Sequence, residues 1–317
     1  MEQDLPNEEE FTQSCLDGDK VNIRVITSKI DENVETIMKN VKQIGEIVVV
    51  VKPTKAIIRE RMKRQAQIII PKIQTKSIDN ITAQLQQTIK MTSKDVRGCC
   101  ILPDGRMAFT CTERRKLILM KANGTKDFEM KLLGAYDVAN GTKDNTVIVS
   151  SCLRKSGISI VDIQDRKIKK FIPDEYQCFG LVERNGNVIF CSGFLKMLNL
   201  HTETVRTIKT GNVSSFSYVD TNGKNIYYTN TSNSGHSVTC CDFQGVIKWT
   251  FKDENILKNT LRISVDEDGF AFVLSNNSVV LISPCGTKHW TLLLSSDGLN
   301  EAQALHYDKA RDILLVA

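Results

Sequence analysis

The sequence lacks the long apolar runs that would place it in or across a membrane. No stretch approaches the roughly 18 consecutive apolar residues of a membrane-spanning helix. The N-terminus is acidic and has no apolar core of a secretory signal. We therefore expect a cytoplasmic protein without membrane contact.

The spacings that bind metals or perform catalysis are also missing. The ten cysteines include no C-x-x-C pair, and the four histidines stand far apart, so a zinc site of standard spacing is not expected. No Ser-His-Asp arrangement, G-x-x-x-x-G-K loop or H-E-x-x-H helix stands out. We expect no catalytic residue, no metal and no cofactor, and we interpret the cysteines as small buried apolar residues in a reducing compartment.

A turn dipeptide followed by an apolar strand recurs through the last two thirds of the chain. The steps between successive glycines run from 36 to 46 residues. This periodicity is typical of a repeat fold. The copies are Asp104-Gly105, Asn185-Gly186, Asn222-Gly223 and Asp268-Gly269, with Asn140-Gly141 as a looser one.

Each copy contains short strands of about five residues, and helical periodicity is absent. One small sheet cannot bury both of its faces, but sheets packed around a common axis can, so the pattern predicts an all-β, six-bladed β-propeller over residues 98–317. The sixth unit has only two strands, Ala304 to Asp308 and Ile313 to Ala317. That blade is incomplete unless residues 79–97, or the apolar runs before them, supply an outer strand.

The sequence pattern of the first 46 residues differs from that of the repeats. Residues 1–20 are acidic and poor in large side chains, which is typical of a disordered tail. Residues 21–46 carry apolar residues at alternating steps of three and four, which predicts a short coiled-coil helix and a homodimer through it. A helix packed on its own domain is the alternative. The predicted seam is Ile23, Thr27, Ile30, Val34, Ile37, Val41 and Ile44.

Residues 47–97 form a basic linker with short strands or helix, and their net charge is +8. The run 47–51 reads as a strand or as the extended tail of the preceding helix, and residues 79–91 fit either a helix or strand alternation. A basic patch could contact phosphate or an acidic partner, although a solvated face is the more common role of so short a run. Its members are Arg59, Arg61, Lys63 and Arg64.

Several phrases carry a family resemblance that runs from about residue 20 to the end. They are Gln65-Ala66-Gln67, Arg97 to Met107, Leu195 to Leu200, Val238 to Asp242 and Ile263 to Gly269. With the order coiled coil, linker, repeats, the chain resembles invertebrate, especially molluscan, tripartite-motif-like proteins with an NHL-like six-bladed propeller.

The resemblance implies a cytosolic protein that dimerises through an antiparallel coiled coil. It also implies a propeller that binds proteins or, in some relatives, RNA. Full-length relatives carry an N-terminal RING finger and B-boxes, which bind zinc. This chain has no cysteine-histidine cluster before Val21, so ubiquitin-ligase chemistry is assigned to none of its residues.

Three functions follow, and the leading one is a non-catalytic scaffold that binds partner proteins through propeller loops. The second is an RNA-binding propeller, suggested by the net charge of +3 in residues 98–317 and by the basic linker. The third is a calcium-dependent propeller hydrolase, in which Glu183, Asp220 and Asp266 would converge on a cation. Such residues more often serve the turns beside them. Trp249 and Trp290 are expected to pack between blades.

Overall fold

The computed structural model describes residues 22–29, 46–53, 77–91, 95–141, 145–153, 156–211, 213–214, 216–232, 235–299 and 301–317. The chain divides into two compact units, Met1–Ile73 and Gln74–Ala317. Each unit is treated by itself.

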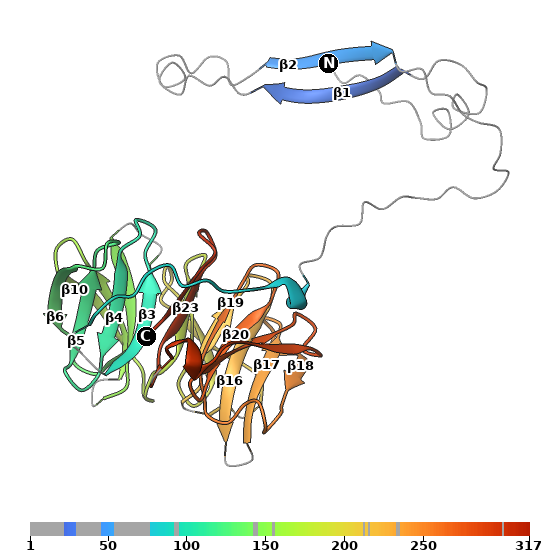
Figure 1. Cartoon of the computed structure of the whole chain (residues 1–317). Coiled ribbons are helices and arrows are strands. Elements are labelled where there is room, and N and C mark those ends of the chain that lie inside the picture. The colour runs from blue at the N-terminus through green and yellow to red at the C-terminus, as the bar shows by residue number, and fades with distance from the viewer. Residues whose placement is uncertain are drawn as a thin grey trace. The chain divides into compact units, whose positions relative to one another are not determined.

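The first unit contains an antiparallel pair of strands, β1 (Asn22–Lys29) and β2 (Glu46–Pro53), labelled in Figure 1. Val25 of β1 lies opposite Val50 of β2. The strand alternative for 47–51 is therefore confirmed. The predicted coiled-coil helix over 21–46 is wrong for 22–29, which form a strand.

The β-branched residues of this stretch explain the difference. Half of β1 is Ile, Val or Thr, and the run 47–51 opposite it is wholly β-branched. Such side chains lose rotamer freedom in a helix and fit a pleated strand. Ile23 and Thr27 of the predicted seam lie on β1. The other predictions for this unit lie outside the described residues: the tail 1–20, Ile30, Val34, Ile37, Val41 and Ile44, and the basic patch Arg59, Arg61, Lys63 and Arg64.

The second unit contains five sheets of four antiparallel strands, each sheet built in chain order. The first is β3 (Val96–Ile101), β4 (Met107–Cys111), β5 (Lys116–Met120) and β6 (Lys126–Lys131). The second is β7 (Ala135–Asn140), β8 (Thr146–Ser151), β9 (Gly157–Asp162) and β10 (Lys167–Pro173). The third is β11 (Leu181–Arg184), β12 (Asn187–Cys191), β13 (Leu195–Asn199) and β14 (Val205–Ile208).

The fourth sheet is β15 (Val219–Thr221), β16 (Ile226–Ser232), β17 (Gly235–Cys241) and β18 (Ile247–Phe251). The fifth is β19 (Thr260–Val265), β20 (Ala271–Ser275), β21 (Ser278–Ile282) and β22 (His289–Leu293). A further pair, β23 (Leu305–Asp308) and β24 (Ile313–Val316), follows the 3-10 turn η2 (Ser295–Asp297). The repeated turn dipeptides join the first and second strands of their sheets.

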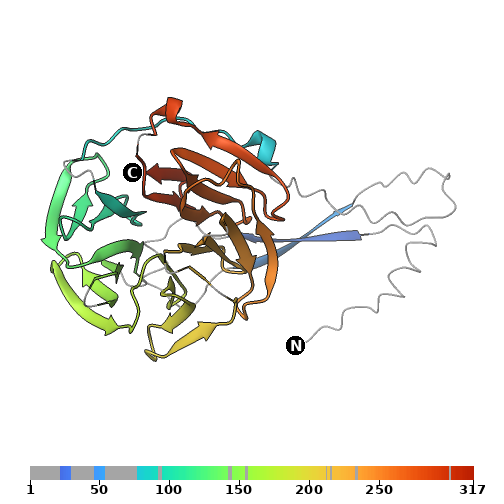
Figure 2. The same cartoon turned by 90° about the horizontal axis from the view of Figure 1, so that it is seen from below.

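The first strands of the sheets close a ring. β3, β7, β11, β15, β19 and β23 contact one another in that order, and β23 also contacts β3. Figure 2 shows the sheets arranged around this common centre. The second unit is therefore a β-propeller, as the repeats predict.

Apolar clusters fill the interfaces between neighbouring sheets, including both interfaces of the β23–β24 pair. Strand β12 shows how one sequence serves two interfaces. Val188 and Phe190 face the second sheet, while Ile189 and Cys191 face the fourth. Because side chains alternate along a strand and both faces are buried, these strands read as continuous apolar runs.

The turn at Gly269 illustrates why glycine recurs in the repeats. Its φ of +95° lies in a region that residues with a Cβ rarely adopt. An added Cβ would also lie 2.6 Å from the Tyr227 hydroxyl of the preceding sheet. Asp266 holds this turn, since its Oδ1 accepts the backbone N–H groups of Gly269 and Phe270 at 2.8 Å each.

The strap, defined as residues 77–91, begins with the 3-10 turn η1 (Ile78–Asn80) and then runs extended without strand pairing. Ile78 and Ile81 pack in the cluster between the fifth sheet and the β23–β24 pair. Ile89 and Met91 pack in the cluster on the other side of that pair. The strap thus borders β23–β24 through side chains and adds no strand to it.

The two tryptophans differ. Trp249 on β18 donates its Nε1–H to the Pro284 carbonyl of the next sheet at 2.8 Å, so packing between sheets is confirmed there. Trp290 on β22 is 54% exposed, so the same prediction is wrong for it. Trp290 lies opposite Leu281, as Trp249 lies opposite Cys240, but the sheet next to it is the β23–β24 pair, which has no outer strand among the described residues to cover the ring.

Candidate functional site

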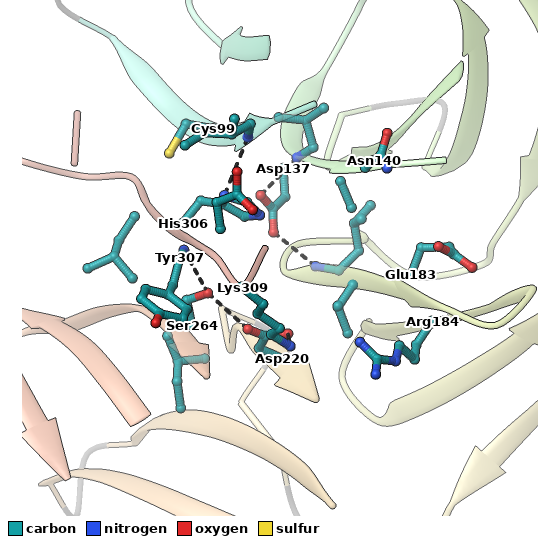
Figure 3. Close-up of a pocket in the computed structure, with 18 of the residues that line it drawn as sticks. Cys99, Asp137, Asn140, Glu183, Arg184, Asp220, Ser264, His306, Tyr307 and Lys309 are labelled. Atoms are coloured by element: carbon teal, nitrogen blue, oxygen red, sulfur yellow. Dashed lines mark hydrogen bonds and ion pairs between the residues drawn. The ribbon is translucent and has the colours of Figure 1, made fainter. Parts of the chain in front are cut away.

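A cavity of about 570 Å³ opens at one end of the ring, where the first strands of the sheets end. Its walls come from β3, β7, β11, β15, β19 and β23 and from the turns that follow them. Figure 3 shows the polar side chains arranged around it. We call this cavity the channel; residues that are far apart in the sequence meet there.

Several of these side chains join the first strand of one sheet to the first strand of the next. Asp137 Oδ2 accepts the Leu181 N–H at 2.9 Å. His306 Nδ1 accepts the Ile101 N–H at 3.3 Å, which joins β23 to β3 and closes the ring. Buried hydrogen bonds of this kind fix the positions of neighbouring sheets.

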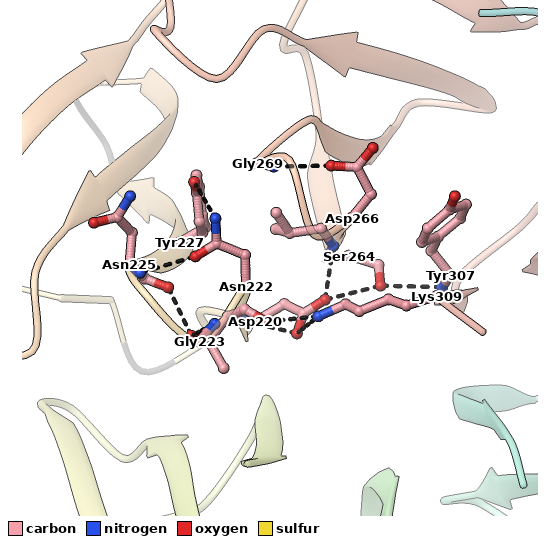
Figure 4. A network of polar contacts seen from close by, with 12 residues as sticks. Asp220, Asn222, Gly223, Asn225, Tyr227, Ser264, Asp266, Gly269, Tyr307 and Lys309 are labelled. Atoms are coloured by element: carbon pink, nitrogen blue, oxygen red, sulfur yellow. Dashed lines mark hydrogen bonds and ion pairs between the residues drawn. The ribbon is translucent and has the colours of Figure 1, made fainter. Parts of the chain in front are cut away.

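Asp220 on β15 makes the densest of these links. Its Oδ2 accepts the Ser264 hydroxyl at 2.9 Å and the Val265 N–H at 2.7 Å, both from β19. Ser264 Oγ in turn accepts the Tyr307 N–H at 3.0 Å, which carries the chain of contacts on to β23 (Figure 4). Lys309 Nζ lies 3.8 Å from Asp220 Oδ1. Protein donors therefore engage both carboxylate oxygens.

An ion pair crosses the channel. Arg262 Nη1 lies 2.5 Å from Asp137 Oδ1, and the two residues come from β19 and β7, on opposite sides of the ring. The guanidinium carbon lies 4.0 Å from the centre of the Tyr218 ring, a cation–π contact. Burial alone would lower the pKa of Arg262, but the charge of Asp137, the hydrogen bond to it and the neighbouring Tyr218 hydroxyl together outweigh burial and raise that pKa. The guanidinium thus neutralises the Asp137 carboxylate inside the channel.

The three acidic residues proposed as calcium ligands do not converge. Glu183 and Asp220 line the cavity, whereas Asp266 does not. Glu183 accepts the Gly186 N–H at 2.8 Å, so Glu183 and Asp266 both serve their turns, as the more common role predicts. Across the described part of the chain, no cluster of three or more His, Cys, Asp or Glu side chains could hold a metal ion.

Sequence reasoning missed Asp137, Tyr218, Arg262 and His306. Asp137, Arg262 and His306 are single polar residues within short strands, Tyr218 directly precedes β15, and no motif marks any of them. Only the closure of the ring shows that these residues face one centre.

The hydrogen bond from the Ile101 N–H to His306, which closes the ring, predicts that the stability of the protein depends on pH. Burial lowers the pKa of His306 below its ordinary value near 6.5; the charges around it are Asp220, Asp308, Lys309 and Asp137. A folded-state pKa below the unfolded one means that the unfolded chain binds the proton more readily. The stabilisation is therefore complete above pH 6.5 and is lost as the pH falls through the lowered pKa. Urea unfolding between pH 5 and 8 measures this loss.

His306→Asn is the matched control, since its amide oxygen can accept the Ile101 N–H but cannot titrate. The parent protein should lose more stability than this variant between pH 7 and 5. Equal losses would mean that other groups set the pH dependence.

Apolar side chains gather on loops at the opposite end of the ring from the cavity. These loops join β6 to β7, β8 to β9, β10 to β11, β12 to β13 and β14 to β15. We call this surface the apolar loop face. Its members, all at least 40% exposed, are Leu133, Leu153, Tyr176, Phe194 and Phe216.

Ring contacts support the aromatic part of this face. Phe216, 58% exposed, lies 4.7 Å from the ring centre of buried Phe179, which lies 4.9 Å from that of Tyr136. Tyr176 and Phe194 form a second pair at 6.1 Å. The Lys196 ammonium lies 5.2 Å from the Tyr176 ring centre and 2.8 Å from Asp174. The exposed rings are thus held by a buried aromatic base and an ion pair.

Most of the thiols in the described residues are buried. Of the nine cysteines in the described residues, eight are buried and Cys285 is exposed. Burial raises the pKa of Cys99 and of Cys178 to about 12. The expectation of small buried residues is therefore confirmed for these eight and wrong for Cys285, which lies on the turn between β21 and β22. Cys15 lies outside the described residues.

Comparison with known proteins supports the fold alone. No protein-family model matches the chain, and no curated protein matches it either. A gluconolactonase from Xanthomonas campestris is similar in structure, with a TM-score of 0.58 and 11% identity over 71% of this chain and 83% of that one. A chain of the nidogen–laminin complex has a TM-score of 0.55 and 12% identity, over 64% of this chain and 81% of that one.

A protein of unknown function from Bacteroides thetaiotaomicron is a third similar structure, with a TM-score of 0.56 and 12% identity. The match covers 68% of this chain and 65% of that one, which is just under two thirds. At these identities the likeness defines a class, the β-propellers. Within the described residues, no helix is long and apolar enough to cross a membrane.

Proposed function

We propose that this chain is a non-catalytic interaction module that binds a partner protein through the apolar loop face. The observation that carries the proposal is the set of exposed apolar side chains on loops at one end of the ring. Soluble proteins seldom expose contiguous apolar surface without a use for it. Aromatic residues on a rigid base are the side chains that contribute most to protein–protein affinity.

The proposal includes the finer features that the resemblance implies. The ring would have six blade positions, with β23–β24 as an incomplete sixth. The protein would be a cytoplasmic, tripartite-motif-like protein with an NHL-like propeller. The nidogen–laminin neighbour supports partner binding only in that its chain was solved within a protein complex.

The carboxylates of the channel already have protein partners, which supports a non-catalytic role. Asp137 and Asp220 each accept hydrogen bonds from the next sheet, and Arg262 neutralises Asp137 within the ring. A calcium-dependent hydrolase would need these oxygens free for a cation. The gluconolactonase neighbour shares the fold, and its activity is a property of that protein.

The test compares partner capture by the parent and by a Phe194→Ser, Phe216→Ser double variant. We expect partners recovered from cell extract by the parent to fall at least tenfold with the variant, because each lost ring removes about 2 kcal/mol or more at a central contact. Quantitative mass spectrometry of the captured proteins measures this change. Affinity for the recovered partner is then measured directly.

Val246→Ser is the matched control. Val246 is also exposed, but it lies on the turn between β17 and β18, at the other end of the ring. Unchanged capture by the double variant would contradict the proposal. Calcium-stimulated hydrolysis of a lactone or ester by the parent protein would contradict its non-catalytic part.

A further inference from the structure

The channel is large enough to hold a small molecule. Its volume of about 570 Å³ lies within the range of roughly 300–1,000 Å³ that is usual for ligand pockets. It opens at the end of the ring opposite the apolar loop face, so a partner protein on that face would leave the channel accessible. What the channel can bind depends on which of its polar groups still lack a partner.

The buried carboxylates of the channel are already engaged. Asp137 and Asp220 accept hydrogen bonds from neighbouring sheets. Asp308 Oδ1 accepts the Ala310 N–H at 3.0 Å, and its Oδ2 pairs with the Arg311 guanidinium. These three acids therefore offer little to a cation that enters the channel.

Arg184 is a cation of the channel without such a partner. It ends β11, is half-buried, and lines the cavity beside Glu183 (Figure 3). Its Nη2 lies 3.3 Å from the position that a Cβ on Gly223 would take, so the guanidinium rests against that turn. It makes no hydrogen bond or ion pair with any residue that the structure describes. A guanidinium presents a fork of donors that matches carboxylate and phosphate oxygens.

Two further N–H donors lie deeper in the channel. Arg262 stands three residues before the end of β19, and its Nη2 is buried without a hydrogen-bond partner in the described part of the chain. His306 accepts the Ile101 N–H at Nδ1, so its neutral ring carries the hydrogen on Nε2. The inner wall of the channel thus offers N–H groups and no unengaged carboxylate, which favours a negatively charged ligand.

Two acids remain at the mouth of the channel. Glu183 accepts the Gly186 N–H at 2.8 Å through Oε1, and burial raises its pKa above the ordinary value. Glu267 is exposed to water, which weakens its effect on a ligand inside. Glu183 is therefore the charge that most opposes an anion beside Arg184.

We propose that the channel binds a small organic anion, either a carboxylate or a phosphate monoester. Arg184 pairs with the anionic group at the mouth. The rest of the ligand carries further oxygen acceptors and extends inward, toward the N–H groups of Arg262 and His306. This site is separate from the apolar loop face and adds a second ligand to the protein.

Isothermal titration calorimetry of the full chain tests the proposal with two probes, succinate and glycerol 3-phosphate. The control ligand is 1,4-butanediol, the uncharged counterpart of succinate. We expect at least one anion to bind and the diol not to bind. Binding of succinate alone would identify a carboxylate site, and binding of glycerol 3-phosphate alone a phosphate site.

Variants at the mouth locate the binding. Arg184→Gln should weaken it at least tenfold, because the charge-assisted pair is lost. Arg114→Gln is the matched control: it makes the same chemical change on the exposed turn between β4 and β5, at the other end of the ring, and should change the affinity less than about twofold. Glu183→Gln keeps an acceptor for the Gly186 N–H and removes the opposing charge, so it should tighten binding about twofold or more. A purely structural role of these residues would not change the affinity in opposite directions.

A second measurement examines the inner wall without mutating it. In the ¹⁵N-labelled parent protein, the side-chain N–H signals of Arg262 and His306 should shift as the probe saturates the channel. Thermal unfolding without ligand confirms that each variant is folded.

Several results would overturn the proposal. They are no binding of either anion, equal binding of the diol, and an Arg184→Gln variant that binds as the parent does. Weaker binding by Glu183→Gln, or Arg262 and His306 signals that stay unchanged at saturation, would also contradict it. The Phe194→Ser, Phe216→Ser variant should bind the anion as the parent does, so this site and the apolar loop face stand or fall separately.

Discussion

Replacing Arg262 by methionine is expected to destabilise the propeller by about 3–5 kcal/mol. The substitution leaves the Asp137 carboxylate in the channel without its cationic partner, and Asp137 is only 4% exposed. A buried charge without a partner costs far more than the ion pair itself contributes. Urea unfolding at neutral pH measures the difference in the free energy of unfolding.

The matched control combines Arg262→Met with Asp137→Asn. The asparagine keeps an acceptor for the neighbouring Leu181 N–H and removes the charge. This double variant should recover a large part of the lost stability. A loss below about 1 kcal/mol for the single variant, typical of a surface ion pair, would contradict our description of the channel. So would a double variant no more stable than the single one.

Removing the Asp220 carboxylate should have the second largest effect. Asp220→Ala leaves the Val265 and Thr221 N–H groups and the Ser264 hydroxyl without their acceptor. An unsatisfied buried donor costs about 1–3 kcal/mol, so we expect a loss of about 3 kcal/mol in total. Thermal unfolding followed by circular dichroism measures the shift.

Asp268→Ala is the control for that experiment. Asp268 is an exposed carboxylate in the turn between β19 and β20, and its removal leaves no buried donor unpaired. The two alanine variants make the same chemical change. If their unfolding temperatures agree within a degree, Asp220 does not hold β15 to β19.

The propeller could be predicted because each repeat carries a recognisable pattern within a few residues of sequence. A turn dipeptide such as Asn222-Gly223 marks the start of a strand, and Val188 to Cys191 shows that both faces of a strand are buried. Glycine is required at the turns by backbone conformation, as at Gly269. Patterns of this kind extend over only a few residues, so they can be recognised in a single sequence.

The predictions failed where two secondary structures compete for the same residues, or where the residues of a site lie far apart in the sequence. Apolar residues seven apart, such as Ile23 and Ile30, suggested a helix, but β-branched side chains and an available partner strand favour β1. The channel residues could not be found because Asp137 and Arg262 are far apart in the chain and neither has a motif. In the sequence, nothing distinguishes a buried arginine from a surface arginine; the closed ring of sheets is needed to show which one is buried.

The hydrogen bond between Ile101 and His306 spans 205 residues of sequence. A ribosome making this chain has to finish β23 before the first and last sheets can meet. Until then, the apolar faces of the first sheet and of the newest one have no neighbour and remain open to aggregation. The nascent chain therefore depends on rapid completion, or on a chaperone that covers those two faces, more than a protein of similar size whose contacts are local.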